Sequence, residues 1–217
     1  MTRGGPFMTD VYKGDAVPKP KGKPLAPPSL QDRLSKIHVL TCTELEQLFT
    51  VITEPRDQAL FLIAYRHGLR ASEVSLLQTT DVNTAATKMK IRRLTRGPSG
   101  THSLQKDESA ALKRYLKSRT DSSVILFLGA RQGPITRRGL DWLMKTYGEQ
   151  AKLPFQKRHF HVLKHSIATH LLSAGADLRF VHEWLGHVLL QSTAIYLYLA
   201  TPPPLETSPH GSFPKFR

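Results

Sequence analysis

One segment, residues 161–196, restricts the fold of this chain more than any other. Its apolar residues recur at helical spacing, which predicts a helix with one face in the core. The residues on that face are Leu163, Ile167, Leu171 and Ala174. Gly175 then predicts the left-handed end of this helix, and Asp177 predicts the N-cap of a second one. The segment therefore predicts two helices joined by a tight turn.

The polar residues of the segment follow the same helical geometry. His161 and Lys164 lie three positions apart, so they share a helix face, which we expect to point away from the core. The second helix is expected to end at Gly186-His187. The residues that it is expected to bury are Phe180, Trp184 and Leu185. A short third segment then carries Tyr196.

This pattern resembles the C-terminal half of the tyrosine recombinase (phage integrase) family. The family has a His-x-x-Arg motif, then Leu-Gly-His, then a nucleophilic tyrosine. The corresponding positions here are His161-x-x-Lys164, Leu185-Gly186-His187 and Tyr196, which follows His187 by nine residues as in the family. An Ala-Thr-His-Leu-Leu run with an Ala-Gly-Ala-Asp turn also matches. Lys164 departs from the pattern, because the family has its second arginine there.

Tyr196 also has a simpler interpretation. A tyrosine between Ile195 and Leu197 is ordinarily a core residue with its hydroxyl at the surface. Tyr198 is a rival nucleophile, but a residue two positions further along a helix points elsewhere. The spacing from His187 favours Tyr196 as the nucleophile that the resemblance implies.

Upstream, the run HGLRASEVSLL resembles the first arginine box of the same family. The resemblance places the first catalytic arginine on Arg70 and its supporting acid on Glu73. Without it, Arg70 would be an ordinary arginine at a helix start, paired with Glu73. Overlapping capping boxes at Thr41 and Thr43 predict an earlier helix, and Pro55 predicts the start of the next.

Residues 88–94 and 101–105 flank a Gly-Pro-Ser-Gly turn and predict a β-hairpin. The family carries a catalytic lysine near the tip of a hairpin here, and LTRGPSGTHSL resembles the single-domain invertases of fimbrial phase switches. By position, Arg96 takes the place of that lysine. The lysines that substitute for it if the hairpin shifts register are Lys88, Lys90 and Lys106. The alternative is a solvated basic hairpin that touches phosphates without chemistry. The residues expected to contact DNA are Lys88, Lys90, Arg92, Arg93 and Arg158.

The remaining elements complete the predicted fold. We expect a helix capped by Asp107, a short strand over residues 124–128 and a helix capped by Thr136. The predicted fold class is mainly α with a small antiparallel β-sheet (α+β), the catalytic-domain fold that the resemblance implies.

The predicted domain organisation is one domain between two tails. Residues 1–36 are rich in Pro, Gly and Lys and predict a disordered tail. Residues 37–200 are expected to form the DNA-cleaving domain, and residues 201–217 a flexible tail. The family's larger members carry a helical DNA-clamping domain before the catalytic one, for which we expect no room here.

Composition favours a nucleic-acid partner. The formal net charge of +14 and the sequence pI near 10.1 suggest a polyanion, and DNA or RNA more than a membrane. Cys42 is the only cysteine, so no disulfide forms within the chain, which suits a reducing compartment. No apolar run approaches the roughly 20 residues of a membrane helix. We therefore expect a soluble, cytoplasmic protein.

Ten histidines invite a metal hypothesis, but their spacing argues against it. His165 and His170 lie five residues apart, as do His182 and His187, so neither pair shares a helix face. No Gly-x-x-x-x-Gly-Lys phosphate loop is present, so nothing indicates ATP use. We expect no metal and no cofactor.

The resemblance implies a definite chemistry. Tyr196 would attack a DNA phosphodiester, and the resulting phosphotyrosine ester conserves the bond energy for rejoining. Arg70 and Lys164 would clamp the non-bridging oxygens, His187 would add a hydrogen bond, and His161 would act as general acid or base. Lysine at position 164 keeps the charge but loses the bidentate fork. Arginine at position 96 does not readily release a proton to the leaving oxygen.

The predicted function is therefore site-specific DNA recombination by inversion, integration or excision. The resemblance implies double-stranded DNA, a homotetramer on paired sites and a DNA-bending accessory protein as partners. One alternative is a recombinase-derived DNA-binding regulator that has lost cleavage. Another is a general basic nucleic-acid binder in which the motif is coincidental. A type IB topoisomerase shares the chemistry, but no sequence here suggests its clamp domains.

Overall fold

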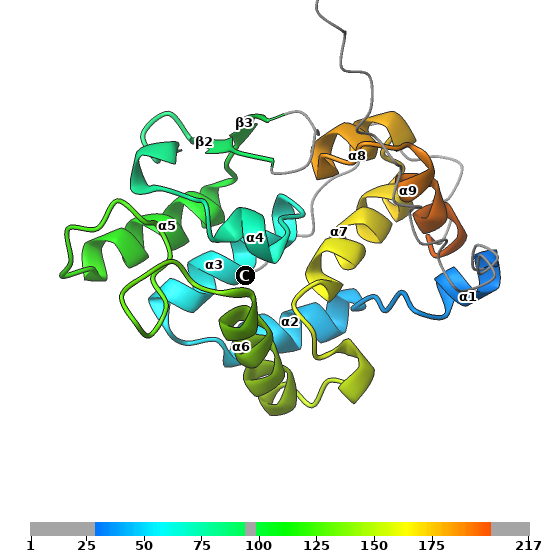
Figure 1. Cartoon of the computed structure of the whole chain (residues 1–217), viewed down its shortest axis with the longest axis horizontal. Helices are drawn as coiled ribbons and strands as arrows, with labels where there is room; N and C mark the ends of the chain where they lie inside the picture. Colours follow the sequence, from blue (N-terminus) through cyan, green and yellow to red (C-terminus); the bar gives the residue numbers. More distant parts are fainter. Residues whose placement is uncertain (1–28, 94–98, 201–217) are drawn as a thin grey trace, which may run out of the picture.

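The chain folds around one buried helix, α3, with helices on either side and a small sheet along one edge. The computed structural model describes residues 29–93 and 99–200. The larger helices are α2 (Cys42–Val51), α3 (Pro55–Arg66), α5 (Lys106–Ser118), α6 (Arg137–Gln150), α7 (Val162–Ser173) and α8 (Leu178–Leu185). The short helices are α1 (Leu30–Leu34), α4 (Ala71–Val74) and α9 (Gln191–Ala194), with 3₁₀ turns η1 (Thr79–Asp81), η2 (Phe155–Lys157) and η3 (Ile195–Tyr198). Figure 1 shows α3 and α7 running through the middle of the molecule.

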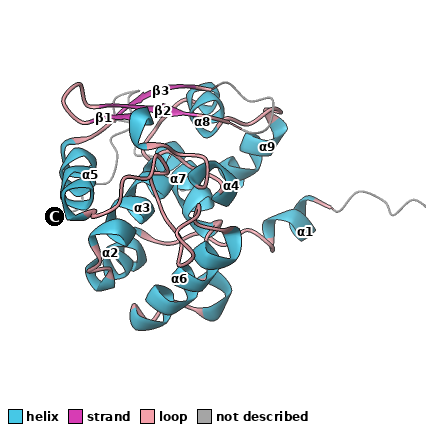
Figure 2. Cartoon of the chain, turned by 60° about the vertical axis from the view of Figure 1, so that its left-hand side comes forward, coloured by secondary structure: helices cyan, strands magenta, loops and turns pink. Residues whose placement is uncertain are grey.

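Three antiparallel strands form the sheet in the order β1-β2-β3. They are β1 (Val82–Asn83), β2 (Lys88–Ile91) and β3 (Gly100–Ser103). Met89 on β2 pairs with Val82 on one side and with His102 on the other. Figure 2 shows the sheet along one edge of the molecule, near α8. The mainly α fold with a small antiparallel sheet, predicted from the sequence, is confirmed.

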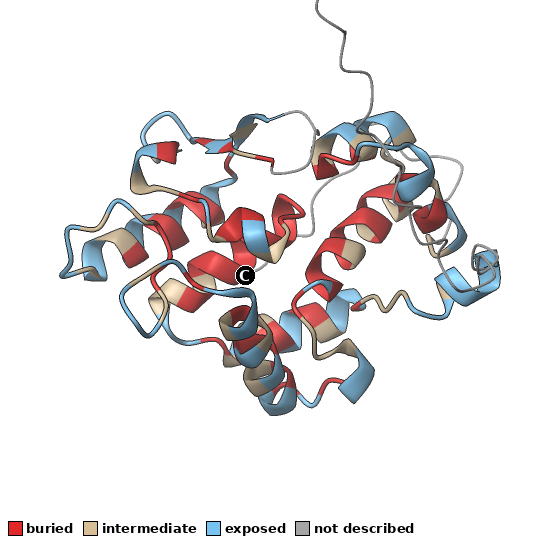
Figure 3. Cartoon of the chain, in the orientation of Figure 1, coloured by how far each residue is buried: buried red, intermediate tan, exposed pale blue. Residues whose placement is uncertain are grey.

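The core explains why α3 and α7 hold the fold. Both helices bury residues on almost every face, as their red ribbons in Figure 3 show. Leu60, Phe61 and Ile63 on α3 and Leu163 and Ile167 on α7 are at most 1% exposed. Full burial of such a side chain contributes about 1.5–3 kcal/mol relative to exposure. These two helices therefore place the loops at their ends rigidly, and the candidate site lies there.

Several predicted helix starts are confirmed by their caps. Thr41 and Glu44 form the capping box of α2, Thr136 caps α6 and Asp177 caps α8. Gly175 has a φ of +85°, which only glycine adopts readily, and it ends α7 as predicted. Local signals were therefore sufficient at these positions.

Other local predictions were wrong. Helix α5 has Gln105 as its N-cap, so Asp107 lies inside its first turn. The strand expected over residues 124–128 is reduced to the isolated bridges Gln78–Ile125 and Leu128–Pro134. Backbone pairing is limited to a few bonds, such as Leu126 N–H to Leu77 O at 2.8 Å, while Arg119 donates to Ile125 O at 3.0 Å and Tyr115 donates to Leu126 O at 2.7 Å.

Two further expectations need adjustment. Helix α1 lies inside the segment expected to be a disordered tail, although it buries no residue. Residues 1–28 and 201–217 lie outside the described residues, so the two predicted tails stay predictions there. On α8 the expected buried stripe is confirmed at Leu185 but wrong at Phe180, which is 45% exposed; Val181 is buried in its place. Within the described ranges, every helix falls short of the length and apolar character of a membrane span.

Candidate active site

Arg70 is held at the start of α4 by the acid three residues after it. The Glu73 carboxylate accepts from the Arg70 backbone N–H at 2.8 Å and from the Arg70 guanidinium at 3.1 Å. Gly68, with a φ of +55°, allows the tight turn from α3 into this position. The Glu73 side chain is 1% exposed, whereas that of Arg70 is 28% exposed. A buried carboxylate thus orients a guanidinium that remains open on one side.

Arg93 is a second partner of Glu73, and its position corrects the prediction that it contacts DNA at the surface. Its guanidinium is fully buried and donates to Glu73 at 2.8 Å. It also donates to the backbone oxygens of His67 at 3.0 Å and Trp184 at 2.5 Å. Arg93 therefore joins the end of the hairpin strand to α8 and to the turn before Arg70.

Gly186 is required by this arrangement. A Cβ atom there would lie 2.6 Å from Arg93 Nε, and the residue has a φ of +61°. The glycine of the Leu-Gly-His motif therefore ends α8 and leaves room for the buried guanidinium.

Lys164 is also buried, so the prediction that it points away from the core is wrong. The residue is 1% exposed, and its Nζ donates to Gly68 O and to Leu185 O at 2.7 Å each. The turn before Arg70 and the end of α8 fold back over α7, which covers the helix face that carries Lys164. Burial, and then the charges of Arg70 and Arg93, lower the pKa of this lysine well below its ordinary value.

Tyr196 lies inside the protein next to a histidine that the sequence analysis did not select. Its hydroxyl is 2.8 Å from His165 Nδ1, and the residue is 4% exposed. Burial raises the pKa of Tyr196 to about 12, although the charge of Arg70 acts in the opposite direction. The rival Tyr198 is 66% exposed and points elsewhere, as its position two residues further on predicts.

His187 is oriented by a buried threonine. Its Nδ1 lies 2.8 Å from Thr193 Oγ1, and the same hydroxyl is 3.3 Å from His182 Nδ1. The His187 ring stacks on that of Tyr196 with a centroid distance of 6.3 Å. Burial, and then the charges of Lys164 and Arg70, lower the pKa of His187 to about 3. A neutral His187 whose Nδ1 faces Thr193 has its Nε2 available for a ligand.

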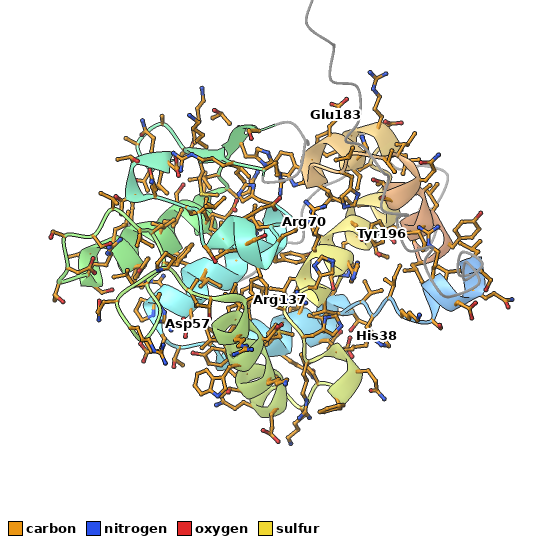
Figure 4. The ribbon with its side chains drawn as sticks, in the orientation of Figure 1. His38, Asp57, Arg70, Arg137, Glu183 and Tyr196 are labelled. Carbon is orange, nitrogen blue, oxygen red and sulfur yellow. The ribbon has the colours of Figure 1, made fainter. Side chains whose placement is uncertain are left out.

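An open pocket of about 1050 Å³ lies beside these residues. Its ionisable lining residues are Lys36, Arg70, Arg137, Asp141, Lys145, His159, His161 and His165. Asp141 is the single acid among them, so the pocket favours an anion. His161 is exposed at this pocket, and its pKa falls to about 4 because its ring is partly desolvated and faces Lys164 and Arg70. In the view of Figure 4, Arg70 and Tyr196 lie on the two sides of α7.

The residues predicted to contact DNA do not line this pocket. Lys88 and Lys90 are exposed on β2. Arg92 pairs with the buried Asp81 at 2.7 Å, and Arg158 donates to Leu153 O at 2.8 Å. Arg96 lies outside the described residues, so its role stays a prediction. The described ranges contain no group of three or more histidine, cysteine or acidic side chains arranged to hold a metal ion.

The site residues that were missed had weak sequence signals. His165 follows His161 by four positions, which places both on one helix face, and their ring centroids are 4.5 Å apart. The sequence analysis compared His165 with His170 as metal ligands and did not test this pair. Thr193 had no signal, because a threonine inside a short helix is common.

Comparison with known proteins identifies the family of this chain. The model of the Phage integrase family matches residues 38–201. Tyrosine recombinase XerC of Oceanobacillus iheyensis is 38% identical over 174 residues, which cover 72% of this chain and 55% of the relative. The chain therefore spans little more than half the length of that recombinase.

Two further matches show the range of the similarity. The type 1 fimbriae regulatory protein FimB of Escherichia coli K12 is 34% identical over 169 residues, covering 74% of this chain and 84% of FimB. The XerH site-specific recombinase, in its pre-cleavage complex with difH substrate, shares the fold. Its TM-score is 0.64 at 24% identity, covering 75% of this chain and 51% of XerH. The predicted resemblance to tyrosine recombinases and fimbrial-switch proteins is confirmed.

Proposed function

The chain belongs to the phage integrase family of tyrosine recombinases, and on this basis we propose that it cuts and rejoins DNA at specific sites. Tyr196 forms a covalent 3′-phosphotyrosine intermediate in this reaction. The observation that carries the proposal is the placement of Tyr196: its hydroxyl contacts His165 at 2.8 Å, and His165 lines the cationic pocket. His165 thus links the candidate nucleophile to a pocket that favours an anion.

The pocket residues are suited to hold the scissile phosphate. Arg70 presents a guanidinium that Glu73 orients, and a preorganised cation stabilises the charge that develops on the non-bridging oxygens. His187 donates a second hydrogen bond from Nε2, because Thr193 engages its Nδ1. His161, at the pocket, serves as general acid or base toward the phosphate. No metal is needed for this division of roles.

In this proposal Lys164 positions other site residues, whereas the sequence predicted that it would bind the phosphate itself. Its ammonium binds the carbonyls of Gly68 and Leu185, so it holds the Arg70 turn and the His187 turn together. The leaving 5′-oxygen also needs a proton, which the family takes from the lysine at the hairpin tip. Arg96 stands there and keeps the positive charge, while it gives up a proton poorly.

Double-stranded DNA is the proposed partner, bound across the pocket with Lys88 and Lys90 toward the flanking backbone. Cleavage of paired sites by this family takes two protomers on each duplex, so we propose a homotetramer on DNA, with a bending protein as an accessory. Inversion is the favoured outcome because the run LTRGPSGTHSL resembles the single-domain invertases of fimbrial phase switches. Integration and excision use the same steps.

The test is a covalent-adduct assay. The purified protein is mixed with duplex DNA from its own locus, nicked beside candidate sites so that cleavage is trapped, and denatured in detergent. We expect an adduct that is lost in Tyr196→Phe and retained in Tyr198→Phe, because the second tyrosine is exposed and outside the site. Binding without an adduct across nicked substrates would replace the recombinase with the DNA-binding regulator.

A further inference from the structure

We propose that His165 is a further catalytic residue, which takes the proton of Tyr196 at Nδ1 and passes a proton from Nε2 to the pocket. This inference rests on the proposed function, and it assigns the step that makes the phenol nucleophilic. The histidine of the His-x-x-Lys motif, His161, then acts on the phosphate side alone.

The first support is the hydrogen bond itself. Tyr196 Oη lies 2.8 Å from His165 Nδ1, with the ring centroids 5.6 Å apart. Within the described part of the chain, no other hydrogen bond of this hydroxyl is found. A phenol that is 4% exposed must release its proton to a group it touches, because water does not reach it freely.

The second support is that His165 lies between the buried hydroxyl of Tyr196 and the open pocket. His165 lines the open pocket, whereas Tyr196 is absent from the described residues that line it. One residue thus joins the two sides: His165 Nδ1 contacts the buried tyrosine hydroxyl, and the same residue lines the pocket. His161 packs edge-on against His165 at 4.5 Å and has no hydrogen bond to Tyr196 in the described ranges.

The charges around His165 set when it accepts a proton. Burial first, and then neighbouring cationic groups, lower its pKa to about 3. The ionisable groups that face it are His38, His159, His161, Lys164 and Tyr196. In the free protein the proton therefore stays on Tyr196, whose own pKa is about 12. A phosphate entering the pocket adds negative charge, which raises the pKa of His165 toward a useful base. DNA itself thus activates the nucleophile.

The proton balance of the step is complete. The Tyr196 oxygen bonds to phosphorus while the bond from phosphorus to the 5′-oxygen breaks. The tyrosine proton moves to Nδ1 of His165, and the imidazolium releases the proton on Nε2 to water in the pocket. The 5′-oxygen takes a proton from water in the pocket, so the proton released at Nε2 and the proton taken up by the leaving oxygen cancel. Rejoining reverses these transfers, and His165 returns a proton to Tyr196.

The experiment compares two histidines on one helix. His165→Asn keeps a polar atom near the Nδ1 position and removes the base. His170→Asn is the matched control, because His170 Nδ1 makes the same 2.8 Å contact with the hydroxyl of Tyr65 on the structural side of α7. Single-turnover adduct formation is measured on nicked duplexes that carry either a normal scissile phosphate or one with sulfur at the 5′-bridging position. The sulfur leaves without a proton, because a thiol has a pKa of about 8.5.

We expect His165→Asn to slow adduct formation by about 10²–10⁴-fold, the usual contribution of a general base. The substrate with the bridging sulfur should not restore the rate of His165→Asn, because this variant lacks the base for Tyr196 and not the acid for the leaving oxygen. The rate of His165→Asn should rise about tenfold per pH unit as hydroxide ionises the phenol. The DNA affinity of both variants should stay close to wild type. The rate of His170→Asn should also stay close to wild type at a temperature where this variant is folded, because its ring bonds Tyr65 and Leu40 O and lies outside the pocket.

Three results would overturn the inference: a His165→Asn rate within about threefold of wild type, well below a general-base contribution; rescue by the sulfur substrate; or an unchanged pH profile. His165→Gln repeats the measurement if the asparagine variant unfolds. Failure of the proposed function looks different, because wild type and Tyr196→Phe would then form equally little adduct.

Discussion

Replacement of Arg93 tests whether the site is built around a buried charge. Arg93→Met keeps most of the apolar stem and removes the guanidinium. Glu73, 1% exposed, then retains Arg70 as its single cationic partner, and the carbonyls of His67 and Trp184 lose a donor. Breaking a buried ion pair from one side costs about 3–5 kcal/mol. We expect about 3 kcal/mol here, because Arg70 still neutralises part of the Glu73 charge.

The assay is urea unfolding followed by circular dichroism. With a slope of about 2 kcal/mol per molar urea, a loss of about 3 kcal/mol lowers the midpoint by about 1.5 M. Lys90→Met is the matched control, since it removes a cation from the exposed face of the adjacent strand. Its free energy of unfolding should change by no more than about 0.5 kcal/mol.

For DNA binding, we expect Lys90→Met to have the larger effect and Arg93→Met the smaller one. Loss of a surface phosphate contact reduces the salt dependence of binding by about one ion, so Lys90→Met should weaken the slope. Arg93→Met, measured at a temperature where it is folded, should keep the wild-type slope. Equal, small losses of stability in both variants would refute a stabilising role for the buried Arg93–Glu73 pair. A weaker salt dependence of DNA binding in Arg93→Met would show that Arg93 contacts DNA.

Three further predictions follow from the same contacts. Thr193→Val removes the hydroxyl that orients His187, so the rate of adduct formation should fall about tenfold, equivalent to about 1.4 kcal/mol. An unchanged rate in Thr193→Val would show that Thr193 has no part in catalysis. Gly186→Ala should lower the free energy of unfolding by about 2 kcal/mol because of its φ of +61° and the close Arg93 side chain. Gly133→Ala, with no atom near the new Cβ, should have little effect in the same urea titration. The free energy of unfolding should decrease as the pH falls from about 6.5 toward 3, because His102, His165 and His187 have folded pKa values of about 3 and the unfolded chain binds their protons first. His102→Gln should flatten this decrease between pH about 7 and about 4.5, and an unchanged slope would show that His102 titrates normally.

Much of the candidate site was predictable because its signals are local. Asp177 predicts the start of α8 as its N-cap, and Gly186 predicts its end as a left-handed glycine. Tyr196 lies nine residues after His187, the spacing of the family. The hairpin of β2 and β3 also follows from its turn residues. Its tip, with Arg96, lies outside the described residues, so that part of the site stays a prediction.

The errors came from residues whose environment is made by distant segments. Arg92 and Arg93 follow β2, and the alternation of that strand assigns Arg93 to the buried face, but the partners that make a buried guanidinium tolerable come from the turn before Arg70 and from α8. The strand expected over residues 124–128 had the right composition, but the side chains of Arg119 and Tyr115 occupy its carbonyls.

The sequence by itself determined the family, several helix starts and ends, and the choice of Tyr196 as the candidate nucleophile, because these depend on residue type and spacing along the chain. Only the tertiary structure decided which cations are buried and which histidine meets Tyr196. Lys164 became a buried positioning group because the Gly68 turn and the end of α8 close over it. His165 contacts the tyrosine hydroxyl because η3 packs against α7, a contact between segments thirty-one residues apart that no local pattern encodes.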